Sequence, residues 1–206
     1  LHQLIHSFPT RRSSDLEGSL AGGHLGFKKE ELLSGKVKEL SELVCEVLQE
    51  IQAYEELYQT SIPVFAAGGV YTREDIAALL NIGASGVQMA TRFIATTECD
   101  ADLAFKQKIV NARKEDITLV ASPAGLPGRA VMTAFMRNAL KGRIAPKHCI
   151  GCMKPCVPAS TPYCISDALV HSVEGDVENG LVFAGANAWR VTDIVSVHDL
   201  MAELCA

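Results

Sequence analysis

The sequence has no run of about 18 apolar residues, so we predict that no segment of it crosses a membrane. It also lacks the apolar core of a secretory signal, internal repeats and long blocks of charge. Its net charge is −5, which gives no reason to expect nucleic acid or an anionic membrane surface as a partner. Seven cysteines without a secretory signal favour a reducing, cytoplasmic location, where thiols are more often core residues, metal ligands or reactive groups than disulfides.

The chain is long enough for one domain with a sizeable core, since 48% of its 206 residues are hydrophobic. Its most informative stretch is residues 62–70 (IPVFAAGGV). The apolar run does not alternate with polar residues, which indicates a parallel strand buried on both faces. The glycine pair, Gly68 and Gly69, lets backbone N–H groups approach a ligand that a side chain would exclude.

A helix and a second strand follow the glycine pair. Thr72 and Asp75 have the spacing of a capping box, which predicts that a helix begins there and continues to Gly83. Residues 86–90 then form a short apolar strand that ends in a small polar turn at Thr91. This order describes a βαβ unit whose two strands end side by side, and a phosphate group would bind at those ends.

Residues 62–70 and 86–93 (GVQMATRF) strongly resemble the last two strands of the flavin-binding (β/α)8 barrels of the nitronate monooxygenase family. Ala90 stands where that family has glycine, and the resemblance runs from Glu17 to the C-terminus. It implies an α/β fold that is the C-terminal, incomplete part of an FMN-binding TIM barrel, with a helical, Cys-rich extension. The implied substrates are an alkyl nitronate or nitroalkane and molecular oxygen.

The resemblance also assigns site residues. Residues 17–27 (EGSLAGGHLGF) are similar to a family segment whose histidine is the proposed catalytic base, which corresponds to His24. Taken alone, a Gly-Gly-His loop is more often an ordinary loop, but an imidazole titrates near neutrality and can remove a proton from carbon. The positions that match flavin contacts are Glu17, Gly22, Gly68, Gly69, Gln88, Met89, Ala90 and Thr91.

A second enzyme class shares these motifs. The Ala-Gly-Gly-His and Ala-Gly-Gly sequences are also similar to those of an FMN- and NADH-dependent enoyl-acyl-carrier-protein reductase of the same superfamily. Two single residues near the motifs have alternative interpretations. Arg92 either lends charge to a phosphate or forms a structural ion pair, and Asn187 either faces the substrate or belongs to a turn.

A cluster of cysteines forms the chain's other candidate site. Cys149, Cys152, Cys156 and Cys164 lie close together among prolines, so their thiolates could surround one tetrahedral metal ion or an iron–sulfur cluster. The Cys-Ile-Gly-Cys opening resembles the cluster loops of some flavin-dependent ene-reductases. The alternative is four reduced thiols in a compact loop. The third candidate function is therefore that of a metal-binding module that binds no flavin.

The first residues of the chain lie outside the resemblance to the family. Residues 6–16 (HSFPTRRSSDL) match, codon by codon, a translation of a common sequencing adapter. We therefore expect an artefactual or disordered leader at 1–16, the C-terminal part of the barrel at 17–145, and a Cys-rich extension packing on it at 146–206. On this expectation the gene continues upstream, and the chain alone does not make a closed, active barrel, which usually takes about 250 residues.

The remaining pattern predicts outer helices and connecting loops. A periodic run from Val37 to Leu57 indicates a long amphipathic helix in which Cys45 is a small buried residue. Residues 117–120 form an apolar run, residues 122–129 form a turn-rich loop, and a helix is expected over 130–140.

Overall fold

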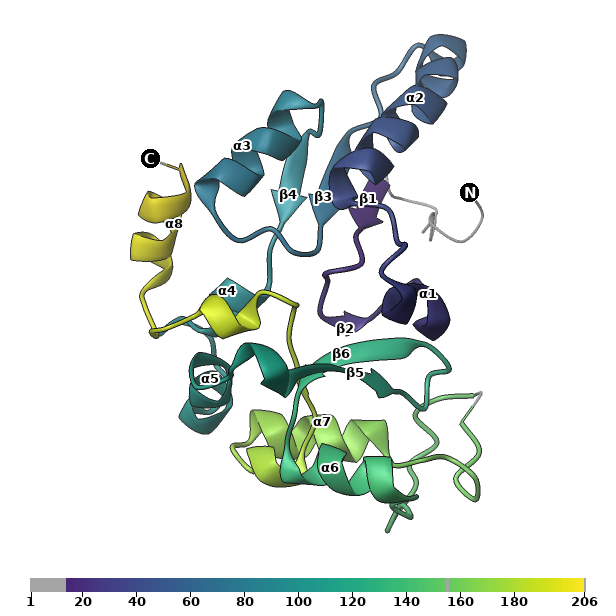
Figure 1. Cartoon of the computed structure of the whole chain (residues 1–206), viewed down its shortest axis with the longest axis vertical. Coiled ribbons are helices and arrows are strands. Elements are labelled where there is room, and N and C mark those ends of the chain that lie inside the picture. Colours follow the sequence, from purple (N-terminus) through teal and green to yellow (C-terminus); the bar gives the residue numbers. More distant parts are fainter. Residues whose placement is uncertain (1–13, 155, 206) are drawn as a thin grey trace.

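The computed structural model describes residues 14–154 and 156–205, in which two small sheets lie one above the other (Figure 1). The upper sheet is parallel, with the order β1-β3-β4. Its register aligns Glu17 with Ala67 and Ala67 with Gln88, so the three strands end level at one edge. Its strands are β1 (Ser14–Glu17), β3 (Val64–Ala67) and β4 (Gly86–Gln88).

Helices connect these strands as in a (β/α) barrel. α1 (Lys29–Ser34) and α2 (Leu40–Tyr58) precede β3, and α3 (Arg73–Asn81) links β3 to β4. The predicted capping box begins α3: the Thr72 hydroxyl accepts from the Asp75 amide at 3.2 Å, and the Asp75 carboxylate accepts from the Thr72 amide at 2.9 Å. The described residues therefore form part of a TIM barrel, as predicted.

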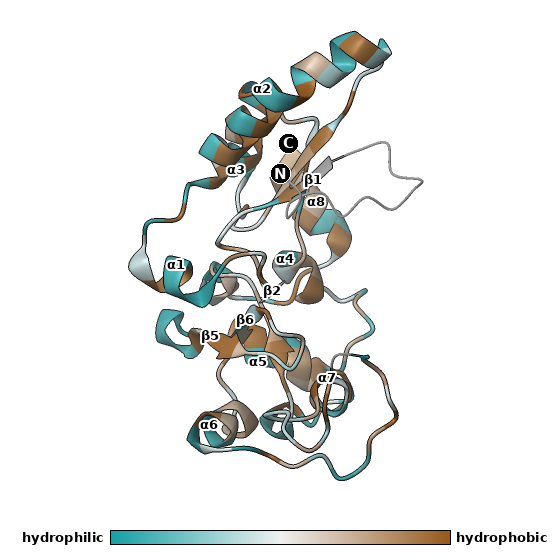
Figure 2. Ribbon diagram, turned by 90° about the vertical axis from the view of Figure 1, so that its right-hand side faces the viewer, coloured by the Kyte–Doolittle hydropathy of each residue, from teal (hydrophilic) through white to brown (hydrophobic). Residues whose placement is uncertain are grey.

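The core of this upper part lies between the sheet and its helices. It contains Leu16, Val44, Ala66, Leu79 and Ala84. On α2 the periodic run buries Val44 and Ile51, while Cys45 is exposed, so the prediction of a buried Cys45 was wrong. Neighbouring helical residues point about 100° apart, so the residue next to a core position can point to solvent. Figure 2 shows hydrophilic and hydrophobic residues alternating along the ribbon of α2.

The lower sheet is antiparallel and is centred on β6, which pairs with the other three strands. α6 (Ala134–Lys141) and α7 (Ile165–Val173) lie below it (Figure 1). Together they enclose a second core that includes Val120, Met136 and Tyr163. The strands are β2 (Gly23–His24), β5 (Ile117–Ala121), β6 (Pro127–Val131) and β7 (Val182–Phe183).

The prediction of a turn and helix over residues 127–133 was wrong, because residues 127–131 form β6. Pro127 is tolerated as the first residue of a strand, and Gly128 is required by close packing, since a Cβ there would lie 2.9 Å from the Phe183 ring. The helix begins later, at Ala134, where the Thr133 hydroxyl accepts from the Met136 amide at 3.1 Å.

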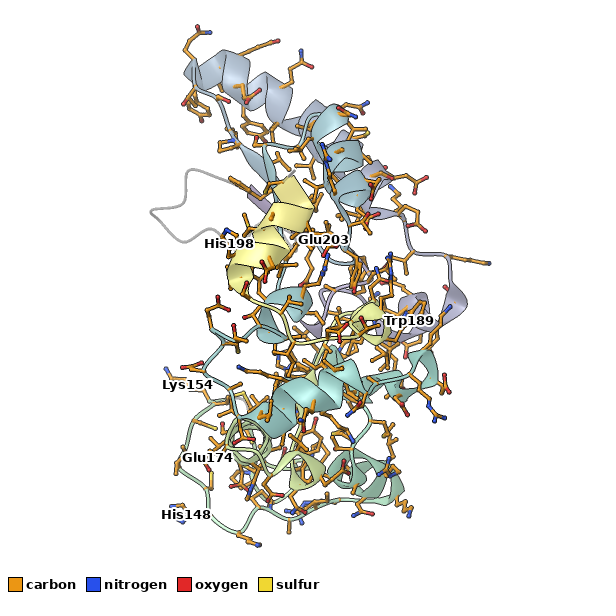
Figure 3. The ribbon with its side chains drawn as sticks, turned by 90° about the vertical axis from the view of Figure 1, so that its left-hand side faces the viewer. His148, Lys154, Glu174, Trp189, His198 and Glu203 are labelled. Carbon is orange, nitrogen blue, oxygen red and sulfur yellow. The ribbon has the colours of Figure 1, made fainter. Side chains whose placement is uncertain are left out.

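The C-terminal segment returns to the upper part. The Arg92 guanidinium donates to the Glu203 carboxylate at 2.7 Å and to the Tyr71 carbonyl at 3.0 Å, so Arg92 forms the structural ion pair that was one of its two interpretations. Figure 3 marks Glu203 on α8. The connecting elements are α4 (Thr91–Ile94), α5 (Leu103–Val110), η1 (Lys114–Asp116), η2 (Val177–Asn179), η3 (Ala188–Arg190) and α8 (Val197–Cys205).

Part of the expected leader belongs to the fold. Residues 14–16 form β1 together with Glu17, and Leu16 is buried against the upper core, although we expected the fold to begin at residue 17. The rest of that leader, residues 1–13, lies outside the described residues. None of the helices in the described ranges combines the length and apolar character that a membrane span requires.

Candidate functional site

A cleft of about 280 Å³ lies where the three parallel strands end. Its walls come from both sheets. Segments 67–71 and 88–94 begin at the ends of β3 and β4 in the upper sheet. Segments 21–23 and 183–188 include or adjoin β2 and β7 in the lower sheet. All eight residues that the sequence associates with a flavin line this one cleft: Glu17, Gly22, Gly68, Gly69, Gln88, Met89, Ala90 and Thr91.

The Gly-Gly turn after β3 forms one wall of the cleft. Gly68 and Gly69 have φ values of 96° and 87°, a conformation that residues with side chains rarely adopt. A Cβ on Gly69 would lie 2.8 Å from the Leu20 Cβ, and one on Gly68 would lie 2.9 Å from the Gly18 carbonyl oxygen. Both glycines are therefore required for the turn to pack against the loop that follows β1.

The segment after β7 holds the opposite side of the cleft. Asn187 donates its side-chain amide to the Gly69 carbonyl at 2.6 Å, and the Thr91 hydroxyl accepts from the Gly185 amide at 3.0 Å. The structure therefore places Asn187 on the cleft wall, and its amide fixes the Gly-Gly turn. These bonds join three loops that are far apart in the sequence.

Glu17 lines the cleft, and Arg129, which does not line it, interacts with Glu17 through its charge. Burial raises the pKa of Glu17, and the positive charge of Arg129 opposes that rise. Burial also lowers the pKa of Arg129, and the negative charge of Glu17 opposes that fall. Arg129 donates to the carbonyls of Ser19 and Ala21 at 2.7 and 2.5 Å, so it holds the loop after β1 in place.

His24 lies beside the cleft and is not one of the residues that line it. Its ring packs edge-on against Phe183, which does line the cleft, with the ring centroids 5.2 Å apart. Its Nε2 lies 2.6 Å from the hydroxyl oxygen of Ser122, which also accepts from the Ala124 amide at 3.1 Å. The hydroxyl therefore restrains the orientation of the imidazole.

Sequence reasoning missed Ser122 and Phe183. Ser122 is the first polar residue after the apolar strand β5, which is the same signal that pointed to Thr91 after β4. The proline and glycines after Ser122 were interpreted only as a loop, so that signal was overlooked. Phe183 carries no signal of its own, because a phenylalanine in a short apolar strand is typical of any core.

The four clustered cysteines lie in the connection between α6 and α7, away from the cleft. All four are free thiols and line one small cavity of about 20 Å³. In residues 14–154 and 156–205, however, no three His, Cys, Asp or Glu side chains are grouped closely enough to hold a metal ion. The structure thus brings the cysteines around one cavity but not into a ligand set.

Parallel strands joined by helices, with a glycine-lined cleft at their carboxyl ends, define a ligand-binding site of the (β/α)-barrel class. The sequence model of the nitronate monooxygenase family matches residues 16–206. The chain therefore belongs to the nitronate monooxygenase family.

Individual relatives agree with this assignment. A probable nitronate monooxygenase of Bacillus subtilis (strain 168) is 26% identical over 196 residues, which cover 92% of this chain and 50% of that protein. One from Staphylococcus haemolyticus (strain JCSC1435) is 32% identical over 127 residues, covering 59% of this chain and 32% of that protein. The chain thus spans half or less of these curated relatives.

Two solved structures are similar in fold. FabK from Thermotoga maritima has a TM-score of 0.68 at 27% identity, over 95% of this chain and 53% of that one. A nitroalkane oxidase from Streptomyces ansochromogenes has a TM-score of 0.65 at 24% identity, over 95% of this chain and 52% of that one. The α/β barrel fold is thereby confirmed.

Proposed function

We propose that this chain carries the phosphate-binding side and the catalytic base of an FMN-dependent enzyme that oxidises alkyl nitronates with molecular oxygen. One observation carries the proposal: all eight residues that the family resemblance assigns to the flavin line a single cleft. These residues come from three separate loops, and only the fold brings them together. Family membership supplies the substrate class, a nitronate or a nitroalkane.

The residues of the cleft suit a flavin phosphate. Gly68, Gly69 and Ala90 offer backbone N–H groups with little or no side-chain bulk, and Thr91 adds a hydroxyl. Gln88 and Glu17 supply polar side chains for the more distant part of the ligand. The cleft, at about 280 Å³, lies just below the roughly 300–1,000 Å³ of small-molecule pockets. FMN held there would supply the electron acceptor for oxidation of the nitronate to a carbonyl compound and nitrite.

His24 would remove a proton from the carbon next to the nitro group of a neutral nitroalkane. The Ser122 hydroxyl lies 2.6 Å from the imidazole and orients it, and the imidazole packs edge-on against Phe183, which lines the cleft. A positioned general base typically contributes about 10²- to 10⁴-fold to a rate. A preformed nitronate has already lost that proton, so its oxidation does not depend on the base.

A reductase of the same superfamily is the second candidate. The observation that favours it is the pair of motifs at residues 21–24 (AGGH) and 67–69 (AGG), which both enzyme classes share. Both motifs contribute to the cleft, so either activity would use the same site. The two candidates differ in the electron donor and in the substrate.

Because the curated relatives are about twice as long as this chain, the test uses these residues within a complete barrel. The purified protein is first examined for the absorbance of bound FMN. Oxygen uptake is then measured with propionate-3-nitronate, and NADH oxidation is measured with a crotonyl thioester. Oxygen uptake supports the proposal. NADH-dependent reduction of the double bond without oxygen uptake would overturn it in favour of the reductase, and protein without flavin would contradict both.

A further inference from the structure

The connection between α6 and α7 is long and has no regular structure. Apart from residue 155, residues 143–164 contain no helix or strand, although loops beyond about 12–15 residues without secondary structure are uncommon in compact domains. Ile150 and Val157 are 73% and 57% exposed, so the middle of the loop leaves these two apolar side chains in solvent. Figure 3 shows His148 and Lys154 at its outer margin. A loop of this kind needs an interaction beyond its own packing to hold it in one conformation.

The four cysteines of this loop surround a cavity with the volume for one small occupant. A water-sized probe needs about 10–15 Å³, and the cavity measures about 20 Å³. No charged side chain shares the lining with the thiols, which are accompanied by apolar residues such as Ile150, Met153 and Ile165. A cavity lined by four soft sulfur ligands in apolar surroundings favours a single soft or borderline metal ion.

Hydrogen-bond donors already point at two of the sulfurs. The Gly151 amide donates to Cys149 Sγ at 3.5 Å, and the Ser166 hydroxyl donates to Cys152 Sγ at 3.1 Å. Gly151 has a φ of 67°, so the chain turns between the two cysteines in a conformation that favours glycine. Outer hydrogen bonds of this kind orient and stabilise the ligands of metal sites.

We propose that Cys149, Cys152, Cys156 and Cys164 bind one Zn²⁺ ion as four thiolates. Among the described residues the sulfurs are not grouped closely enough to act as ligands, so binding requires the loop to move inward. Cys149 and Cys152 are exposed and lie on irregular backbone, which leaves them free to move. Each thiol releases its proton to solvent when it binds, and ordering of the loop is coupled to binding.

The site has a structural connection to Ser122. Cys164 follows Tyr163, whose hydroxyl donates to the Ala121 carbonyl at 2.7 Å, and Ala121 immediately precedes Ser122. Tyr163 is almost fully buried, so it fixes one end of the loop to the end of β5. Zinc would therefore hold the loop against the strand that presents Ser122, without contact with the flavin cleft.

The test uses the whole chain, reduced and freed of metal, and then mixed with Zn²⁺ alone. After gel filtration we expect one zinc per chain, and four of the seven thiols protected from a thiol reagent. Replacing zinc with Co²⁺ should give the visible colour of tetrahedral cobalt thiolates. Cys152→Ser and Cys164→Ser should lose the bound zinc. Cys45→Ser and Cys205→Ser, which alter exposed thiols outside the loop, are the matched controls and should retain it.

Ser166→Ala keeps every ligand and removes only the donor to Cys152. We expect it to weaken zinc affinity by about 10- to 100-fold with unchanged helix content by circular dichroism. Folded chain without zinc, equal zinc loss in the control variants, or disulfides in place of free thiols would each overturn the proposal. Iron with visible charge-transfer absorbance would overturn it in favour of a cluster.

Discussion

The imidazole of His24 lies 2.6 Å from the hydroxyl oxygen of Ser122, although the two residues are 98 positions apart in the sequence. The lower sheet explains this contact, because β2 and β5 lie on either side of β6. His24 is opposite Gly128, and Gly128 is opposite Val120, two residues before Ser122. The absence of a side chain at Gly128 leaves room for the Phe183 ring, which packs edge-on against His24. The geometry of the proposed base therefore depends on a strand that the sequence did not indicate.

Replacing Gly69 with Val should abolish retention of FMN by the complete barrel. A side chain there would overlap Leu20 and would strain a backbone with a φ of 87°, so the turn could not keep its amides in the cleft. Gly35→Val is the matched control, since Gly35 also has a positive φ of 65° but has open space around it and lies outside the cleft. Flavin absorbance after gel filtration measures both variants. Normal flavin content in Gly69→Val protein would contradict the assignment of this wall.

Replacing Ala90 with Gly should leave FMN binding equal to or tighter than that of the unchanged protein. This change restores the residue that the family has at the position, and it removes only one methyl group from the cleft wall. Fluorescence titration with FMN measures the affinity. A clear loss of affinity would show that the Ala90 methyl group contacts the cofactor.

Replacing His24 with Asn should lower turnover of neutral nitroalkanes by about 10²- to 10⁴-fold and should leave turnover of preformed nitronates nearly unchanged. The reason is that only the neutral substrate needs a base. Oxygen uptake with the same compound in its two ionisation states provides an internal control. Equal losses on both forms would indicate that His24 orients the substrate and transfers no proton.

Replacing Ser122 with Ala should reduce nitroalkane turnover by about 10-fold or less, because one hydrogen bond is worth about 1 kcal/mol. Turnover of preformed nitronates should stay nearly unchanged, since the hydroxyl orients only the base. Ser122→Thr keeps the hydroxyl and should retain nitroalkane turnover. A purely structural role would instead lower both activities together.

Replacing Tyr163 with Phe should make the stability of the chain less sensitive to alkaline pH. Burial raises the pKa of Tyr163 to about 12, above its usual value of 10.0. A raised pKa in the folded state contributes stability that is complete below pH 10 and lost as the pH rises through 12. The free energy of unfolding should therefore fall over this interval, by no more than about 2–3 kcal/mol from this group.

Guanidinium unfolding of both proteins at pH 8 and pH 11.5 checks this expectation. At pH 8 the Phe variant should be less stable by about 1 kcal/mol, because the bond to the Ala121 carbonyl is lost. At pH 11.5 the difference should shrink. An identical pH dependence in the two proteins would show that Tyr163 does not titrate in this interval.

The parallel part of the fold was predictable because its signals are local. The apolar run before Gly68, the capping box at Thr72 and the short strand before Thr91 each lie within a few residues of the element they specify. The positions of Gly68, Gly69 and Thr91 at one edge then follow from the parallel register.

The antiparallel part was not predictable in the same way. Pro127 and Gly128 punctuate a turn in most sequences, and here they form a strand because three other strands pair with it. Those partner strands come from segments as far apart as residues 23 and 183, so no local sequence pattern predicts the pairing. The contact between His24 and Ser122 belongs to this same sheet. The helical pattern of α2 was correct, since Val44 and Ile51 are buried, and only the expectation that Cys45 is buried was wrong.

The two hydrogen bonds from Arg129 to the carbonyls of Ser19 and Ala21 also bear on the order of folding. They join β6 to the loop after β1 across 110 and 108 positions of sequence. Contacts this distant carry a high loop-closure entropy and form after local helices and hairpins. The β5–β6 hairpin can therefore form early, while the loop that supports Gly68 and Gly69 is shaped only after the two sheets dock. The cleft then forms late in folding. Ligand binding that appears during refolding would therefore mark the point at which folding of the chain is complete.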